Sequence, residues 1–274
     1  MRRRMRSQIV LFAALAIVTA VNLTPVIWGI LTSIKLPVDA FAIPPRFIFT
    51  PTFQFHEQIW LDKGFGRFLW NSTVISAGTV VTSVSVGAMA AYGLSRLSSA
   101  ASRGLLFALL SMRMFPHILL AIPFFVLAKT LGLINTYPAM ILALVAINQP
   151  FTIWLMRSFF LDVPHELYEA AAIDGCNAWQ VFVRVALPVV RPGLWVTALF
   201  SLLLAYNEFL FALVLTGPDT KTLPVAIAEY GGEDINYWSL SAAAAVGIML
   251  PIVVFMMLLQ RHLVRGLALG AVKG

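Results

Sequence analysis

Charged residues are scarce in this sequence. Only 11% of the 274 residues are charged, whereas 60% are hydrophobic and the mean hydropathy is +0.87. An average soluble domain is about 25% charged, so this composition excludes an ordinary soluble protein. The formal net charge is +7. No polar segment carries a basic stripe with interleaved aromatic residues, so we expect no nucleic-acid partner.

Cysteine and catalytic motifs are also nearly absent. The single cysteine, Cys176, excludes an intrachain disulfide framework and a thiolate cluster for zinc. The sequence contains no GxxxxGK[ST] phosphate loop and no HExxH or GxSxG motif. We therefore expect no catalytic residue, metal site or cofactor on this chain, and any nucleotide hydrolysis belongs to a separate protein.

Long apolar runs are what the sequence does contain. A hydrocarbon core about 30 Å thick requires roughly 20 apolar residues in a helix. Six runs reach or approach that length: residues 9–34, 73–94, 105–127, 139–156, 194–215 and 242–259. They leave little chain for a soluble domain. The sequence predicts an all-α, polytopic membrane protein in which residues 1–274 form one domain with six transmembrane helices.

The N-terminus allows two interpretations. Residues Met1–Arg6 are basic and precede an apolar run, as in a secretory signal peptide, and Val18–Ala20 has the small-residue spacing of a cleavage site. The apolar run continues past Pro25 to Leu31, however, which gives it the length of a span. We therefore predict a first transmembrane helix.

Lysine and arginine are distributed unequally between the predicted loops. Six spans place both termini on one side, where the loops and termini hold twelve of these residues, against six on the other side. Cytoplasmic loops carry the excess of Lys and Arg in membrane proteins. Both termini and the loop at 161–188 are therefore predicted to be cytoplasmic.

The loop at 161–188 begins with the pattern of a short helix. Asp162 is placed to cap it, Pro164 falls in its first turn, and Gly175 can end it in a left-handed conformation. Glu166 and Glu169 make its surface acidic. This composition fits either an amphipathic helix on the membrane surface or a knob that docks into another protein.

A second short helix is predicted after the glycine. Asn177 and Gln180 have the spacing of a capping box, and Pro188 limits the end of this helix because it lacks a backbone N–H. The loop is thus predicted to consist of a helix, a tight turn and another helix, between the fourth and fifth spans.

This loop also carries a spaced motif. It comprises Glu169-Ala170-Ala171-Ala172-Ile173-Asp174-Gly175 and, after nine residues, Val185-Ala186-Leu187-Pro188. The pattern resembles the signature loop of ABC importer permeases, which is EAA, three residues, Gly, nine residues and Ile-x-Leu-Pro, with Val185 in place of Ile. The resemblance implies that this loop is the coupling helix that sits in a cleft of an ATPase subunit. The coupling residues it implies are Glu169, Ala170, Ala171, Asp174, Gly175, Leu187 and Pro188.

Further segments resemble the carbohydrate-importer permeases of the maltose type. They are Arg113-Met114-Phe115-Pro116 with Ile122-Pro123, Asn207-Glu208-Phe209, and the ending from Gly266 to Gly274. In this family the tail, here residues 261–274, reaches between two ATPase subunits, which implies contacts by Gly270, Lys273 and Gly274. The alternative from the residues alone is a frayed basic terminus.

The resemblance also implies an assembly. Its members are a homologous second permease, two ATPase subunits that bind ATP and Mg, and an extracytoplasmic solute-binding protein. The chain would then lie in the lipid bilayer of a bacterial inner membrane and carry a sugar, oligosaccharide, polyol or substituted sugar. Which of these solutes is carried stays open.

Several strongly polar residues fall within the apolar runs. Arg113 lies ten residues past Arg103 and therefore about 15 Å into the bilayer, and Glu208 reaches a similar depth from the other side. Ionisable groups at that depth usually line an aqueous path or are paired. Arg113, Asn148, Asn207 and Glu208 are therefore candidates for a translocation path; the alternative for Arg113 and Glu208 is a structural salt bridge between the third and fifth spans.

Prolines mark three further positions within the spans. Pro116, Pro123 and Pro150 are predicted to interrupt their helices, and broken helices can expose carbonyls where they line a cavity. A simple kink is the alternative at each position.

Other functional classes compete with an importer. An ion-gradient-driven transporter or channel would use Arg113 and Glu208 as a relay, but no inverted repeat is detectable. A membrane enzyme would use Glu208 or His117, but neither has a second catalytic group at a recognisable spacing. Within the importers, an amino-acid or phosphate permease is the nearest alternative.

Overall fold

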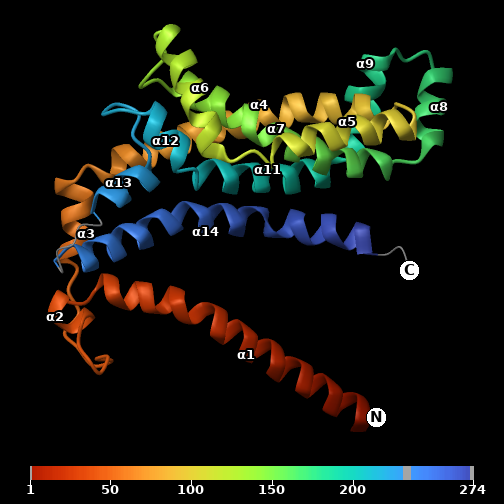
Figure 1. The fold of residues 1–274 in the computed structure, drawn as a ribbon. Coiled ribbons are helices and arrows are strands. Elements are labelled where there is room, and N and C mark those ends of the chain that lie inside the picture. The colour runs from red at the N-terminus through yellow and green to blue at the C-terminus, as the bar shows by residue number, and fades with distance from the viewer. Residues whose placement is uncertain (1, 231–235, 272–274) are drawn as a thin grey trace. The chain divides into compact units, whose positions relative to one another are not determined.

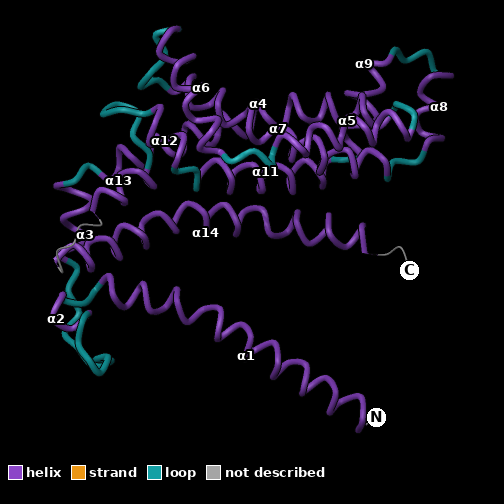
Figure 2. Tube along the Cα trace, in the orientation of Figure 1, coloured by secondary structure: helices purple, strands orange, loops and turns teal. Residues whose placement is uncertain are grey.

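The computed structural model describes residues 2–230 and 236–271, and every regular element within these ranges is a helix (Figure 2). The predicted all-α fold is thereby confirmed. The chain divides into two compact units. Residues Met1–Gly66 with Ala226–Leu250 form one, here called the terminal unit, and residues Arg67–Val225 with Pro251–Gly274 form the other, here called the central unit.

The terminal unit begins with one long apolar helix. Its helices up to residue 62 are α1 (Arg2–Ser33), α2 (Pro37–Ala40), α3 (Gln54–Glu57) and the π-helical turn η1 (Gln58–Asp62). Within Gln8–Ser33 of α1, the 18-residue window that marks the candidate span has a mean hydropathy of 2.3, and none of that window is buried by the rest of the chain. A helix that is apolar all round must be covered by lipid or by other protein. This helix therefore fits the predicted first span.

A buried lysine organises the segment after α1. Lys35 is only 1% exposed, and its Nζ donates a hydrogen bond to the carbonyl oxygen of Arg46 at 2.7 Å. The same Nζ lies 4.7 Å from the ring centroid of Trp28 and 4.8 Å from that of Phe49. Cation–π contacts offset part of the cost of burying an ammonium group. This lysine thus holds the proline-rich segment against the end of α1.

His56 makes the terminal unit sensitive to acid. Its Nε2 lies 3.1 Å from Ser33 Oγ, and burial lowers the pKa of the imidazole below its ordinary 6.5. The folded state therefore binds a proton less readily than the unfolded chain, so the contribution of His56 is complete above pH 6.5 and is lost as the pH falls below it. We expect the melting temperature to decrease between about pH 7.5 and about pH 5.5, and His56→Gln to remove part of that decrease. An equal decrease in the variant would contradict this assignment.

The central unit is a helical bundle. Its helices are α4 (Phe65–Ser95), α5 (Ser99–Met112), α6 (His117–Thr130), α7 (Tyr137–Leu161), α8 (His165–Ile173), α9 (Ala178–Val181), η2 (Phe182–Ala186), α10 (Leu187–Val189), α11 (Arg191–Tyr206) and α12 (Leu210–Leu215). Two more helices, α13 (Leu223–Tyr230) and α14 (Asn236–Ala271), belong partly to each unit. Figure 1 shows α8 and α9 at one end of this bundle and α6 and α12 toward the other.

Helix α7 is the centre of the bundle. More than half of its apolar stretch, 56%, is buried, and it packs against α5, α11 and α12. Ser83 on α4 also reaches it, with Oγ donating to Gln149 Oε1 at 2.8 Å and lying 3.1 Å from Thr152 Oγ1. Polar side chains of this kind join helices inside a membrane. Helix α7 therefore connects the two ends of the unit.

Gly87 allows α4 to approach α7 closely. A Cβ at this position would lie 2.5 Å from Thr152 Cγ2, whereas Gly93 on the same helix has nothing within 4 Å. We expect Gly87→Leu to destabilise the protein by about 2 kcal/mol or more through overpacking and Gly93→Leu to have little effect. Thermal unfolding of the two variants in detergent compares them. Equal melting temperatures would exclude a close contact at Gly87.

The span count is not settled by helix length. Four helices are long and apolar enough to cross a membrane, and the count rises to six if each of two bent pairs is one span. In one pair, α5 and α6 meet at 84° across residues 113–116; in the other, residues Ala178–Val189 and Arg191–Tyr206 meet at 79°. The interruption predicted at Pro116 within the run 105–127 is therefore confirmed, and six spans stay a prediction.

The prolines explain part of this pattern. Pro116 is the N-cap of α6 and has an extended backbone, with a ψ of 127°. The ring of a proline clashes with the preceding turn of a helix, and the residue before a proline disfavours the helical conformation, so a helix tends to stop before it. Pro123 and Pro150 instead lie inside α6 and α7, so the predicted interruptions at these two positions were wrong. Neighbouring helices tolerate prolines within a span.

Candidate coupling loop and translocation path

The first helix of the loop, α8, starts later than predicted. Pro164 is its N-cap, with no side-chain hydrogen bond, and Asp162 is the C-cap of α7. The prediction that Asp162 caps this helix was therefore wrong. The reason is that α7 continues to Leu161, so Asp162 still has a helical backbone while Pro164, with a ψ of 135°, is the extended residue from which α8 begins.

Gly175 ends α8 as predicted. Its φ is +81°, its N–H donates to Ala172 O at 3.1 Å, and the next N–H, of Cys176, donates to Ala171 O at 3.0 Å. This pair of bonds is the Schellman arrangement, which requires a residue in the left-handed conformation. A tight turn between the two halves of the loop is the result.

The second half of the loop also follows the prediction. The capping box is present, with Gln180 N–H to Asn177 Oδ1 and Asn177 N–H to Gln180 Oε1 both at 2.9 Å. The helix then widens into η2, where Leu187 N–H donates to Phe182 O, and the helical path ends at Val189, one residue after Pro188. The chain then turns by 79° into α11.

One face of α8 anchors it to the bundle. Tyr168 and Ala171 are 5% and 7% exposed. The ring centroid of Tyr92 on α4 lies 6.1 Å from that of Tyr168 and 5.1 Å from that of Phe182, and the Arg96 guanidinium carbon lies 4.7 Å from the Tyr168 centroid. Burial, and then Tyr92, raise the pKa of Tyr168 although Arg96 opposes them. Aromatic rings on both halves of the loop therefore pack against the bundle.

The other face of α8 is accessible. Glu169, Ala170 and Asp174 are exposed, and Ile173 is 86% exposed. Glu169 Oε1 lies 3.1 Å from His165 Nδ1. Of the predicted coupling residues, Ala171 therefore faces the bundle, whereas Glu169, Ala170 and Asp174 are available to another protein.

Arg113 lies at the break between α5 and α6. Its guanidinium carbon is 5.3 Å from the ring centroid of Phe151, and it lines a cavity of about 290 Å³ together with His117, Phe124 and Pro150. The lining thus combines a cation with aromatic and aliphatic side chains. Asn148, Asn207 and Glu208 are not among the residues of this cavity.

Glu208 has a local role instead. Its Oε1 accepts hydrogen bonds from the N–H groups of Leu210 at 3.0 Å and Phe211 at 3.2 Å, and so caps α12. Within the described ranges no ion pair joins Glu208 to Arg113, so the alternative of a structural salt bridge was wrong. Glu208 makes these capping bonds because the break after Tyr206 leaves the two backbone N–H groups without helical partners.

The two predicted asparagines differ in environment. Asn207 is exposed and donates from Nδ2 to Leu203 O at 2.8 Å. Asn148 is 4% exposed, and its Nδ2 has no hydrogen-bond partner among the described residues. The predicted tail contacts cannot be placed, because Lys273 and Gly274 lie outside the described residues and Gly270 is described only as backbone of α14.

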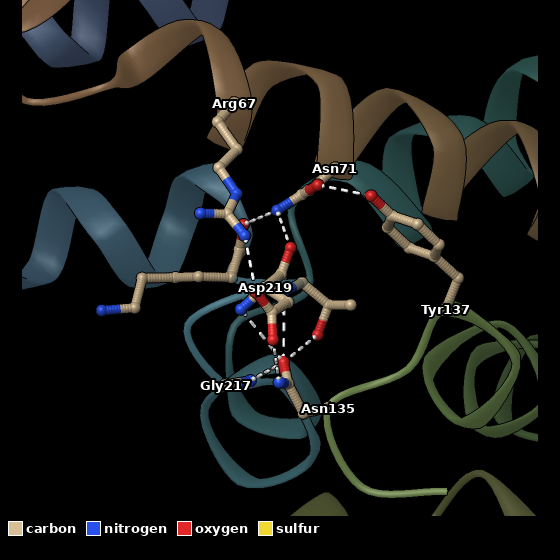
Figure 3. A network of polar contacts seen from close by, with 8 residues as sticks. Arg67, Asn71, Asn135, Tyr137, Gly217 and Asp219 are labelled. Carbon is tan, nitrogen blue, oxygen red and sulfur yellow. Dashed lines mark hydrogen bonds and ion pairs between the residues drawn. The ribbon is translucent and has the colours of Figure 1, made fainter.

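A polar cluster that was not predicted lies at the end of the central unit away from α8 (Figures 1 and 3). It is centred on Asn135, whose Oδ1 accepts hydrogen bonds from the N–H groups of Gly217, Asp219 and Thr220 at 3.0 to 3.2 Å. Asn135 Nδ2 donates to Asp219 Oδ2 at 2.8 Å, and Arg67 pairs with Asp219 Oδ1 at 2.7 Å. This Asn135 cluster ties together segments that are about 80 to 150 residues apart in the chain.

Asn71 extends the cluster into the bundle. It is 1% exposed, its Nδ2 donates to the carbonyl oxygens of Asp219 at 3.0 Å and Lys221 at 2.9 Å, and its Oδ1 accepts from Tyr137 Oη at 2.7 Å.

The only local signal for this cluster in the sequence was Asn135 itself, an asparagine in a short loop. Asparagine tolerates the left-handed backbone that Asn135 adopts, with a φ of 60°.

Comparison with known proteins agrees with this geometry. Residues 83–269 match the family model described as the binding-protein-dependent transport system inner membrane component. The probable ABC transporter permease protein y4oR of Sinorhizobium fredii is 40% identical over 92% of this chain and 91% of its own length. The trehalose transport system permease protein SugB of Mycobacterium tuberculosis is 36% identical over 94% and 95%, respectively.

A solved structure shows the same fold. One chain of a bacterial ABC transporter involved in the import of the polysaccharide alginate matches with a TM-score of 0.75 and 23% identity, over 95% of this chain and 98% of the other. The family model covers the helices on both sides of the helix–glycine–helix loop. This chain therefore belongs to the family of inner-membrane components of binding-protein-dependent transport systems, and is a multi-pass membrane protein.

Proposed function

We propose that this chain forms one half of the membrane pore of an ATP-driven importer that carries a carbohydrate into the cytoplasm. The observation that carries the proposal is the helix–glycine–helix loop with its EAA motif. Its acidic face is exposed, while its other face packs on α4 through Tyr92, whose ring lies against those of Tyr168 and Phe182. Phe182 also lies against Phe160 of α7. A force applied to the exposed face is therefore transmitted to the bundle as a rigid-body movement.

Several observations support a carbohydrate as the solute. The sequence segments around Arg113 and Asn207 resemble carbohydrate-importer permeases, a relative is named for trehalose transport, and the structural match comes from a transporter of a polysaccharide. The cavity at Arg113 combines a cation with aromatic side chains, which suits hydrogen bonding to hydroxyl groups and stacking against the apolar face of a sugar ring.

The resemblance to ABC importers supports the rest of the proposed assembly, and the absence of a phosphate loop from this sequence assigns ATP hydrolysis to other subunits. Two ATPase subunits would bind ATP and Mg and receive the exposed residues of α8, with the tail at Gly270, Lys273 and Gly274 reaching between them. A homologous second permease would complete the pore, and an extracytoplasmic binding protein would deliver the solute. The excess of lysine and arginine in the predicted loops on one side supports a cytoplasmic location for this loop and both termini, in a bacterial cell.

Purification of this chain from its native membrane tests the proposal. We expect an ATPase and a second permease to copurify, and the reconstituted complex to hydrolyse ATP faster in the presence of one binding protein loaded with its sugar. Recovery of this chain alone, without nucleotide hydrolysis and with uptake driven by an ion gradient, would instead support the gradient-driven transporter. Stimulation by a loaded amino-acid- or phosphate-binding protein would keep the importer and exclude the carbohydrate.

A further inference from the structure

A large cavity in the central unit lies where the coupling loop rejoins the bundle. It has a volume of about 1020 Å³ and lies between α4, the second half of the loop (α9 to α10) and the start of α11. This volume is at the upper end of the range of ligand pockets, which is roughly 300 to 1,000 Å³. Neither the exposed face of α8 nor the cavity at Arg113 contributes a residue to it, so it is a separate feature.

The chemistry of this groove is apolar with one cation. Its walls are mainly aliphatic and aromatic, and Arg191 is the only charged residue among those that line it. Two tryptophans, Trp179 and Trp195, line the same groove and are 61% and 44% exposed. Tryptophan is enriched at membrane–water interfaces, where one part of the ring meets lipid and the other meets water.

Arg191 is free to accept an anion. Its side chain is exposed, and within the described ranges no carboxylate forms an ion pair with it. A cation beside an apolar groove at the membrane surface is complementary to a molecule with an anionic head and an apolar tail. The anionic lipids of the cytoplasmic leaflet have this structure.

We propose that this groove binds an anionic phospholipid, with the phosphate of the head group at Arg191 and an acyl chain along α4. The lipid then fills the space between the coupling loop and the bundle, so that a movement of the loop acts on α4 and α11 through a packed contact. The proposal goes beyond the import of a carbohydrate, because it assigns a second ligand and a separate site. It requires only that the loop end of the bundle lies at the cytoplasmic membrane surface.

Lipid retention tests the role of the cation. The assembled transporter is reconstituted in vesicles of equal phosphatidylcholine and phosphatidylglycerol, extracted in mild detergent, and analysed by native mass spectrometry for bound phosphatidylglycerol. We expect R191Q to lower the retained phosphatidylglycerol by roughly fivefold, the effect of one cation at an anionic surface, and R191K to retain it. The matched control is R184Q, because Arg184 is an exposed arginine of the same loop that does not line the groove.

Filling the groove provides a second test that leaves Arg191 intact. Ser85 lines the groove and is exposed on α4, so S85W places a ring where the acyl chain would lie without disturbing a packed contact. We expect this variant also to lose the phospholipid. A cysteine at the same position, S85C, is crosslinked within the assembled complex to identify any protein that lies against the groove.

The outcomes separate the possibilities. If R184Q and R191Q lose equal amounts of bound phosphatidylglycerol, the lipid is held by general surface charge and not by this groove. If R191Q and S85W both retain all of it, the groove is excluded as a lipid site. Crosslinking of S85C to the second permease would show that protein covers the groove. Because retention is measured without any solute, a wrong assignment of the carbohydrate changes none of these results.

Discussion

Replacing Gly175 with valine is expected to reduce ATP-driven uptake by roughly tenfold, because the left-handed conformation costs a side chain about 1 to 2 kcal/mol and more when it is β-branched. The strain displaces the bonds from the N–H groups of Gly175 and Cys176 to Ala172 and Ala171 that end α8. Without them the exposed face of α8 loses its fixed orientation relative to the bundle. Uptake and ATP hydrolysis are measured side by side in reconstituted vesicles.

Three substitutions at this position separate backbone strain from steric clash. A Cβ at Gly175 would have nothing within 4 Å, so any effect arises from the φ of +81°. We therefore expect uptake to decrease in the order Gly, Asn, Ala, Val, since asparagine tolerates the left-handed region best among residues with a side chain. Hydrolysis that continues while uptake falls would support coupling through this turn. Full uptake in Gly175→Val would contradict the assignment.

Asn135→Asp is expected to destabilise the central unit by about 2 kcal/mol, because it replaces a hydrogen-bond donor with a carboxylate oxygen facing Asp219. The wild-type amide donates from Nδ2 to Asp219 Oδ2 at 2.8 Å. In the variant two negative charges would meet at this distance. The Asp219 side chain is 72% exposed, and solvent screening therefore keeps the expected effect well below that of a buried pair.

The reciprocal exchange is the control for this prediction. Asn135→Asp combined with Asp219→Asn restores one amide and one carboxylate, while the oxygen that accepts from Gly217 and Thr220 is kept. We expect the double variant to recover most of the lost melting temperature. The wild type, the two single variants and the double variant form a double-mutant cycle, and we expect its coupling energy to be favourable. Additive losses would show that the contact between residues 135 and 219 does not stabilise the fold.

The composition of the chain determined its class. Six apolar runs and a charge content of 11% are sufficient to predict helices in a membrane, because a hydrocarbon core leaves helices as the main way to satisfy every backbone hydrogen bond of an apolar segment. Local chemistry also determined the turns of the helix–glycine–helix loop. The left-handed Gly175 and the capping box of Asn177 follow from interactions within three or four residues, and such interactions can be predicted from sequence alone.

Packing decided where one helix ends and the next begins. The start of α8 at His165, with Asp162 left to α7, depends on how far α7 continues. The break at residues 113–116 was signalled by Pro116, yet Pro123 and Pro150 have the same chemistry and lie within continuous helices. Proline removes one hydrogen bond wherever it occurs, and only the neighbouring helices decide whether the chain bends there.

The sequence by itself determined that this chain is a helical membrane permease with a helix–glycine–helix loop around Gly175. Only the tertiary structure decided the partners of its polar residues: Glu208 caps α12 and does not pair with Arg113, and Asn135 joins the loop after α12. Local patterns act over one helical turn and can be read along the chain. Contacts across about 80 residues depend on which helix faces are brought together, and the bundle sets that arrangement.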